Sequence, residues 1–267
     1  MFRLLQIEIK KALGFKAIWW LSLLYFGVIA AMLFGVEAFI NEVVTDAGKN
    51  LPIQIPGVSL YSFPGVWHNL AYLASFLKIF MAIIGIILVT NEYSYKTIKQ
   101  QVLHGLSRYE LFWAKVLLNM TIALFATFVL ALIAGILGFR NTETITLAAF
   151  TAKLSFLLAY FFEVFAYLSM ALMIATLVHR SGFAIGILML YAFIIDPIVD
   201  YKLPNDWGDF LPATAIGHII QLPNSQLMKL FGIEFQEFVA IRDILIAGGW
   251  ILIFNGIVFW YLKKKDL

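Results

Sequence analysis

Long apolar runs alternate with short polar segments along this chain of 267 residues. A helix that crosses a bilayer needs about 20 mostly apolar residues, and six stretches meet or approach that length. Lys78 and Glu163 lie well inside these stretches, and the other two charged residues within the bounds given below, Lys115 and Asp196, stand near the ends of their spans. We therefore expect an all-α membrane protein that forms a single domain, 1–267, with six transmembrane helices. Their expected bounds are about 17–36, 68–90, 112–138, 154–178, 182–198 and 244–262.

Composition supports the membrane assignment and narrows the chemistry. Charged residues make up 13% of the chain, about half the share found in soluble domains. The chain has no Cys, which excludes disulfides, thiolate metal sites and a Cys nucleophile. The four histidines are scattered, without the paired spacing of a metal site. We expect no bound metal and no nucleic-acid partner.

Lys and Arg are distributed unevenly between the two sides of the expected helices. With the N-terminus inside, twelve of these residues lie on the inner side and six on the outer side, and Lys78 lies within a span. Inner loops of membrane proteins carry the excess of positive charge. We therefore expect a multi-pass protein of the bacterial inner membrane with both termini in the cytoplasm.

The first sixteen residues form a basic, amphipathic segment. Apolar residues recur at helical spacing, at Phe2, Leu5, Ile9 and Leu13. Such a stripe is typical of a helix that lies in the membrane interface with its lysines toward anionic headgroups. A positively charged flank that only sets the topology is the alternative interpretation.

A polar segment of 18 residues, 91–108, separates the second expected span from the third. Four apolar residues in it lie on one face of a helix, namely Tyr95, Ile98, Val102 and Leu106. We expect a short surface helix over about 94–104. Its mixture of aromatic and amide side chains favours a protein groove over lipid headgroups as the surface that receives it.

Two local signals follow this short helix in the sequence. Gly105 stands where a helix C-terminal cap is expected, because glycine adopts the left-handed conformation at little cost. Ser107 and Glu110 have the S-x-x-E spacing of a capping box, which predicts the start of the third span. The segment should therefore hold a fixed shape.

The run EYSYKTIKQQVLHGLSRYELFWAK, Glu92 to Lys115, resembles the first cytoplasmic loop of ABC-2 type permeases, the membrane subunits of bacterial ABC transporters. The matching features are Glu92, Thr97, the turn with Gly105, Ser107 and Arg108, and Lys115 at the start of the next span. The chain length, the six helices and a Leu211–Pro212 segment after the fifth span extend the resemblance to the whole layout.

The resemblance implies that the loop is a coupling helix, which docks into a groove on a separate ATPase subunit. The residues expected to contact that subunit are Glu92, Tyr95, Lys96, Thr97, Ile98, Lys99, Val102, His104, Gly105, Ser107 and Arg108. It also implies a second permease copy, or a homologous permease, as partner. The chain contains no G-x-x-x-x-G-K-[ST] motif, so we expect no enzyme activity of its own, and ATP and Mg²⁺ on the partner.

Lys78 and Glu163 are the two charged residues expected well inside spans. A charge at mid-depth costs about 2.5–3.5 kcal/mol on insertion scales, so each is a candidate functional residue. Lys78 could extend to the outer interface, pair with Glu163, or contact substrate on a polar path. Gly182 and Gly186 have the spacing that permits close helix approach, and we expect them at a dimer contact.

The function expected from these features is the permease subunit of an ATP-driven exporter. An ATP-independent secondary transporter or channel that uses Lys78 and Glu163 is the alternative. An intramembrane enzyme is disfavoured because no set of catalytic residues converges in the pattern. The transported substrate does not follow from the sequence.

Overall fold

The computed structural model describes residues 2–16, 18–31, 35, 61–103, 105–223 and 236–264. Within these ranges the chain is helical and has no β-strand. Two helices at one end of the bundle are short, α1 (Phe2–Gly14) and α5 (Thr97–Leu103). The other elements are α3 (Gly65–Ser75), α4 (Lys78–Ser94), α6 (Arg108–Asn141), α7 (Leu147–Thr151), α8 (Ser155–Val178), α9 (Ser181–Leu190), the π-helix η1 (Tyr191–Ile195), α10 (Asp196–Lys202), the 3-10 helix η2 (Asn205–Phe210), α11 (Pro212–Gly217) and α13 (Ile241–Lys264).

Four described stretches are long and apolar enough to cross a membrane: 108–141, 147–178, 181–202 and 241–264. Two further spans result if each of two bent helix pairs counts as one, which gives six. These pairs are Leu4–Gly14 with Ile18–Ala31, bent by 80°, and Gly65–Ser75 with Lys78–Ser94, bent by 49°. The predicted all-α membrane fold is confirmed, with four to six spans.

Three spans differ from the bounds expected from the sequence, and the simplest case is the third, which covers 108–141 and not 112–138. The second is not a continuous helix over 68–90, because α3 ends at Ser75 and α4 begins at Lys78. The fifth continues through η1 and α10 as far as Lys202, beyond the expected 182–198. The helix Ile18–Ala31 falls within the expected first span, whose remaining residues lie largely outside the described part of the chain.

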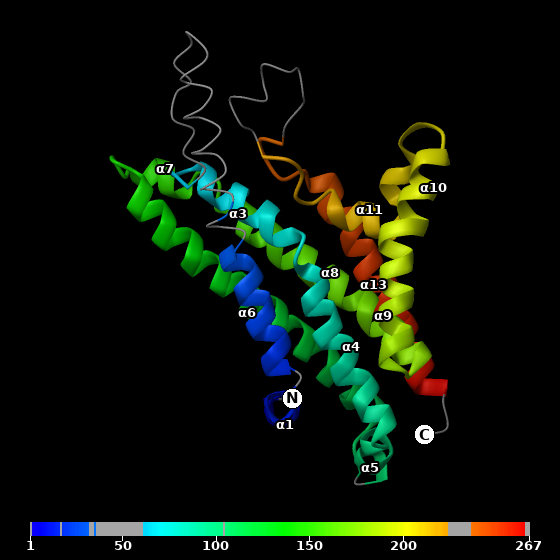
Figure 1. The fold of residues 1–267 in the computed structure, drawn as a ribbon. Coiled ribbons are helices and arrows are strands. Elements are labelled where there is room, and N and C mark those ends of the chain that lie inside the picture. The colour runs from blue at the N-terminus through cyan, green and yellow to red at the C-terminus, as the bar shows by residue number, and fades with distance from the viewer. Residues whose placement is uncertain are drawn as a thin grey trace.

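The helix α8 is the centre of the bundle. It packs against α3, α4, α6, α9 and α13, and Figure 1 shows it running between them. In its most apolar stretch 67% of the residues are buried, against 28% or less in the other three long spans. Its buried face is rich in alanine, including Ala159, Ala166 and Ala171. Small residues of this kind let neighbouring helices approach closely in a membrane.

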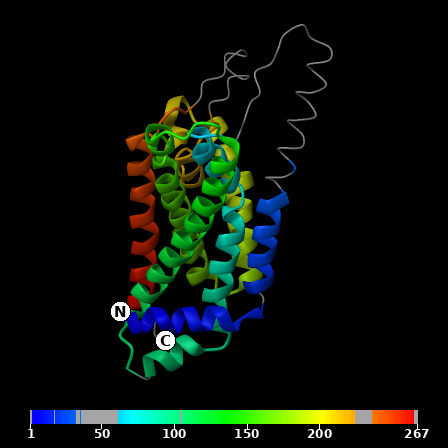
Figure 2. The same ribbon diagram turned by 90° about the vertical axis from the view of Figure 1, so that its left-hand side faces the viewer.

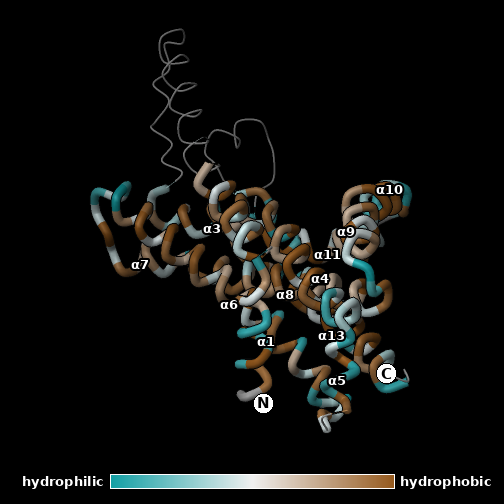
Figure 3. The backbone as a smooth tube through the Cα atoms, turned by 60° about the horizontal axis from the view of Figure 1, so that its bottom comes forward, coloured by the Kyte–Doolittle hydropathy of each residue, from teal (hydrophilic) through white to brown (hydrophobic). Residues whose placement is uncertain are grey.

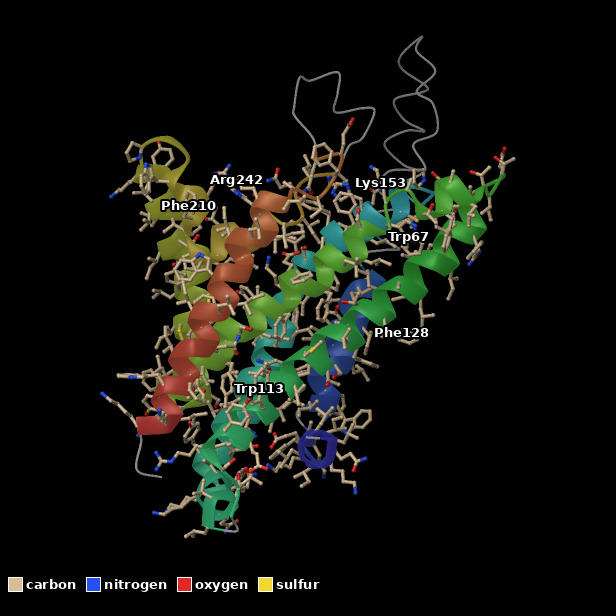
Figure 4. All side chains as sticks on the ribbon, turned by 180° about the vertical axis from the view of Figure 1, so that it is seen from behind. Trp67, Trp113, Phe128, Lys153, Phe210 and Arg242 are labelled. Atoms are coloured by element: carbon tan, nitrogen blue, oxygen red, sulfur yellow. The ribbon has the colours of Figure 1, made fainter. Side chains whose placement is uncertain are left out.

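The helix α6 shows that the outer surface of the bundle is suited to lipid. Its buried stripe includes Leu130 and Ala134, whereas Phe128, Leu132 and Ile136 on other faces are exposed. Figure 4 shows Phe128 pointing away from the bundle. A helix that is apolar on its exposed face as well as its buried one fits a bilayer and not water. The hydrophobic colouring of the long helices in Figure 3 agrees.

Figure 1 shows that α1, α5 and the end of α13 share one end of the bundle, which we call the inner end. The helices α7 and α10 lie at the opposite, outer end. In Figure 2, α1 lies across the inner end of the bundle, and it is bent by 80° from the helix Ile18–Ala31 that follows it. This arrangement is the one expected of an interfacial helix.

Candidate functional site

The short helix α5 projects from the inner end between α4 and α6 (Figure 1). Tyr95 and Lys96 form the turn that precedes it, and Lys96 has φ 55°, in the left-handed region that side chains disfavour. The hydroxyl of Thr97 donates to the carbonyl of Glu92 across this turn (3.3 Å). The helix α5 is therefore shorter than the range of about 94–104 expected from the sequence.

A glycine turn ends α5. Gly105 has φ +91°, as predicted from its position. Its N–H donates to the carbonyl of Val102 (3.0 Å), and the N–H of Leu106 donates to that of Gln101 (3.1 Å). These two bonds form the Schellman motif, which satisfies carbonyls left over at the helix end. His104, also predicted to contact a partner, lies outside the described residues.

The predicted capping box opens α6. The hydroxyl of Ser107 accepts from the N–H of Glu110 (3.2 Å), and the N–H of Ser107 donates to the Glu110 carboxylate (3.0 Å). The hydroxyl of Ser107 also donates to the Glu110 carboxylate (2.7 Å). Turn and box together connect α5 to α6 without a flexible linker.

The two faces of α5 differ in burial. Ile98 is buried against the apolar core at the inner end, and Val102 is half-buried. Leu103 is 77% exposed, and Lys99 is exposed too. Tyr95 is also exposed, because it stands in the turn and not on the predicted apolar face. We call the exposed residues Tyr95, Lys96, Lys99 and Leu103 the α5 outer face.

Arg108 was predicted to contact the partner, and the structure places it against the last turn of α13. Its guanidinium donates to the backbone carbonyl of Lys263. A cation is favourable there, because carbonyls at a helix C-terminus carry partial negative charge. This bond ties the start of α6 to the end of α13.

A buried ionic cluster lies directly behind α5. The ammonium of Lys115 is 2.5 Å from Glu92 and 2.7 Å from Glu8, and Lys11 is 3.2 Å and 2.9 Å from the same two carboxylates. We call these four residues the inner ionic cluster. They come from α1, α4 and α6, so the cluster joins the interfacial helix to both helices that hold α5.

The two lysines balance the charge of the two acids. Burial alone would raise the pKa of Glu8, but the charges and hydrogen bonds of Lys115 and Lys11 outweigh it and hold that pKa below its ordinary value of 4.5. Within the described part of the chain, the second carboxylate oxygen of Glu92 is buried and has no hydrogen-bond partner. The hydrogen bonding of the cluster is therefore incomplete at Glu92, its member nearest to α5 in the sequence.

A second ionic group lies toward the outer end, at the break between α3 and α4. Lys78 donates to one oxygen of Glu163 (2.5 Å), and the hydroxyl of Ser75 donates to the other (2.5 Å). Glu163 is fully buried on α8. Of the arrangements left open by the sequence, the structure shows the two charges paired.

Gly182 and Gly186 lie on one side of α9 with open space around them. Together with Phe183, Ile187 and Leu190 they line a groove of about 520 Å³. Nothing in the described chain fills this groove, so these glycines remain candidates for packing against another helix.

Sequence reasoning missed three site residues, namely Glu8, Ser75 and Asp196. Each acts on a residue far away in the chain, so no local spacing reveals it. The carboxylate of Asp196 accepts from the N–H groups of Ala213 and Thr214 (both 2.9 Å) and thereby caps α11. Of the three, only Glu8 could have been found from the sequence, because it is an acid in a basic N-terminal segment.

Fold and site together define a multi-pass helical membrane protein with a rigidly mounted helix on its inner end. The sequence model of the family described as ABC-2 family transporter protein matches residues 3–267. The chain therefore belongs to the ABC-2 transporter family. A search of curated proteins finds no match.

Proposed function

We propose that this chain is the permease subunit of an ATP-driven transporter, and that a separate ATPase subunit acts on it through the α5 outer face. Membership of the ABC-2 family supports the permease role. The observation that carries the rest is Leu103, a large apolar side chain 77% exposed on a polar inner-end helix. Such a residue beside lysines and a tyrosine suits a protein groove.

In this proposal ATP and Mg²⁺ bind to the partner subunit, and this chain only changes conformation in response to the partner's movement. A displacement of α5 moves α6 as well, because the Gly105 turn and the Ser107 capping box connect the two helices tightly. It reaches α1 and α4 through the inner ionic cluster, which holds both helices against Lys115. Movement of these helices then moves the transmembrane spans to which they are connected, and this movement drives transport.

The remaining parts of the proposal concern direction, assembly and location. We assign the chain to export across a bacterial inner membrane, with α1, α5 and the end of α13 in the cytoplasm. Two copies, or one copy and a homologous permease, would pack through the groove at Gly182 and Gly186. The positive charges on the inner side support this orientation.

One observation favours the alternative of an ATP-independent transporter. The second span is broken beside the Lys78–Glu163 pair, and secondary transporters bind substrates at broken helices. Transport driven by an ion gradient in vesicles that lack any ATPase subunit would establish that alternative.

Co-purification from native membranes in mild detergent tests the proposal. We expect a soluble ATPase with the wild-type chain, and at least a tenfold loss of it with Leu103→Asp, because a buried unpaired charge costs more than the 1.4 kcal/mol that a factor of ten requires. Tyr201→Asp is the matched control: Tyr201 is 91% exposed, but on α10 at the outer end. Equal recovery with both variants, or no ATPase with the wild type, would refute the proposal.

A further inference from the structure

A cavity of about 400 Å³ lies beside the Lys78–Glu163 pair. Its walls come from the break between α3 and α4, from α8, from η1 and from the segment around α11. That volume is within the usual range for small-molecule sites. Because α4 rises about 1.5 Å per residue from Lys78 to its inner end at Ser94, the cavity lies roughly 24 Å above that end, in the outer half of a 30 Å bilayer core.

The position of Lys78 is not explained by helix stability. Lys78 is the first residue of α4, where the partial positive charge of the helix N-terminus disfavours a cation. The break also directs its ammonium toward α8, where it meets Glu163 and lies 5.5 Å from the centre of the Tyr167 ring. Lys78 is therefore held at this position by Glu163 and Tyr167 and not by the helix terminus.

Lys78 and Glu163 both line the cavity, and the donors at the cavity belong to Lys78. Glu163 is fully buried, and both its oxygens accept hydrogen bonds from Lys78 and Ser75. The side chain of Lys78 is 19% exposed. An ammonium has three N–H donors, and among the residues that the structure describes Lys78 donates one hydrogen bond, to Glu163, which leaves two donors for a ligand. An anionic group suits these donors, whereas a cation would meet the ammonium first.

The rest of the lining is aromatic and aliphatic. Phe76 and Phe193 line the cavity, and both are more than half exposed in the single chain. Tyr72 and Tyr167 lie deeper along the same wall. A ligand that reaches Lys78 from the bilayer therefore passes between two phenylalanines, which suits a hydrocarbon chain.

The segment around α11 closes the outer side of the cavity. Ala213 and Gly217 line it, and the carboxylate of Asp196 holds the first N–H groups of α11. His68 contacts the carbonyl of Gln221 at the far end of the same segment (3.0 Å). Contacts with other elements therefore hold this segment at both of its ends.

We propose that this cavity binds a single-chain amphiphile with one anionic headgroup, a carboxylate or a phosphate, that enters from the outer half of the bilayer. The headgroup accepts from Lys78, the first methylenes contact Phe76 and Phe193, and the rest of the chain stays in lipid. That such a molecule is also the transported substrate rests on the proposed permease function.

Binding of oleoyl lysophosphatidic acid to the full chain in phosphatidylcholine nanodiscs tests this proposal. We expect saturable binding above that of empty nanodiscs. The dissociation constant should be at least tenfold higher for the double variant Lys78→Met, Glu163→Gln, which removes both charges together. Lys78→Arg should retain binding. Arg140→Gln, which removes an exposed cation at the end of α6, is the matched control and should bind like the wild type.

Two competitors identify the ligand class. Monooleoylglycerol has the same chain without the anion and should compete poorly, as should inorganic phosphate, which has no chain. Equal competition by monooleoylglycerol, effective competition by phosphate alone, or unchanged binding by the double variant would each overturn the proposal.

A photoreactive acyl probe on the wild-type chain gives a second measurement that does not depend on any variant folding. We expect labelling near Phe76 and Phe193 that excess lysophosphatidic acid prevents, and labelling that the excess leaves unchanged would overturn the proposal. No ATPase subunit is present in these assays. Failure of amphiphile binding is thus distinguishable from failure of partner association.

Discussion

At the scale of single residues, Gly105 has the clearest conformational role. Its φ of +91° lies in the left-handed region, which costs about 1–2 kcal/mol for a residue with a side chain. A Cβ placed there meets no atom within 4 Å, so the cost of Gly105→Ala is conformational and not steric. We expect that substitution to weaken both the turn and the association with the ATPase subunit.

Gly248→Ala is the control for this prediction. Gly248 also has open space around it, but it lies inside α13, where alanine is the better helix former. Thermal unfolding in detergent, with ATPase co-purification, compares the two variants. Equal behaviour of Gly105→Ala and Gly248→Ala would show that the left-handed turn is unimportant.

Glu8 predicts a pH dependence of stability. Because its folded pKa lies below its ordinary value of 4.5, its contribution is present above that pH and is lost as the pH falls through the folded pKa. The advantage of the wild type over Glu8→Gln should therefore be full at about pH 7 and shrink toward about pH 3. Melting temperatures of both proteins across this range measure it, and an advantage that grows in acid would contradict the assignment.

At the scale of elements, the inner ionic cluster determines how α1, α4 and α6 hold together. Lys115→Met leaves Glu8 and Glu92 buried with one cation between them, and loss of one partner from a buried pair costs about 3–5 kcal/mol. The double variant Lys115→Met, Glu8→Gln restores the charge balance and should recover part of that loss. Unfolding in detergent measures both, and a single variant as stable as the wild type would refute the cluster's role.

The elements also show which features could be predicted from sequence. The Gly105 turn and the Ser107 capping box depend on residues a few positions apart, so their spacing was sufficient. The break after Ser75 has no proline or glycine to mark it, and the second span therefore looked continuous. Glu8 meets Lys115 over 107 positions, a contact that only the packing of α1 across the bundle creates.

At the scale of the whole molecule, the two ionic groups lie at different depths of one bundle around α8. The inner ionic cluster adjoins the α5 outer face, and the Lys78–Glu163 pair lines the cavity toward the outer end. The helix α4 connects them, because it begins at Lys78 and includes Glu92 near its end. A movement that shifts α4 at the inner end therefore also acts on the cavity, which gives the proposed permease a physical route from partner to site.

Only part of the candidate site could be predicted from the sequence. Lys78 and Glu163 were identifiable because charges are rare in apolar spans, and their similar depth made a pair possible. Ser75 and Asp196 resemble ordinary polar residues until the fold brings them to Glu163 and α11. The cavity itself results from the break in the second span, and the sequence pattern does not predict that break.

Site-specific cross-linking tests the central claim most directly. Because the chain has no native cysteine, Leu103→Cys and Tyr201→Cys each create a single reactive thiol, on α5 and on α10 respectively. A short thiol-to-amine cross-linker applied to native membranes should join Leu103→Cys to an ATPase subunit, and ATP should alter the yield. Tyr201→Cys should give no such product. An ATPase joined to neither position, or to both equally, would contradict the account.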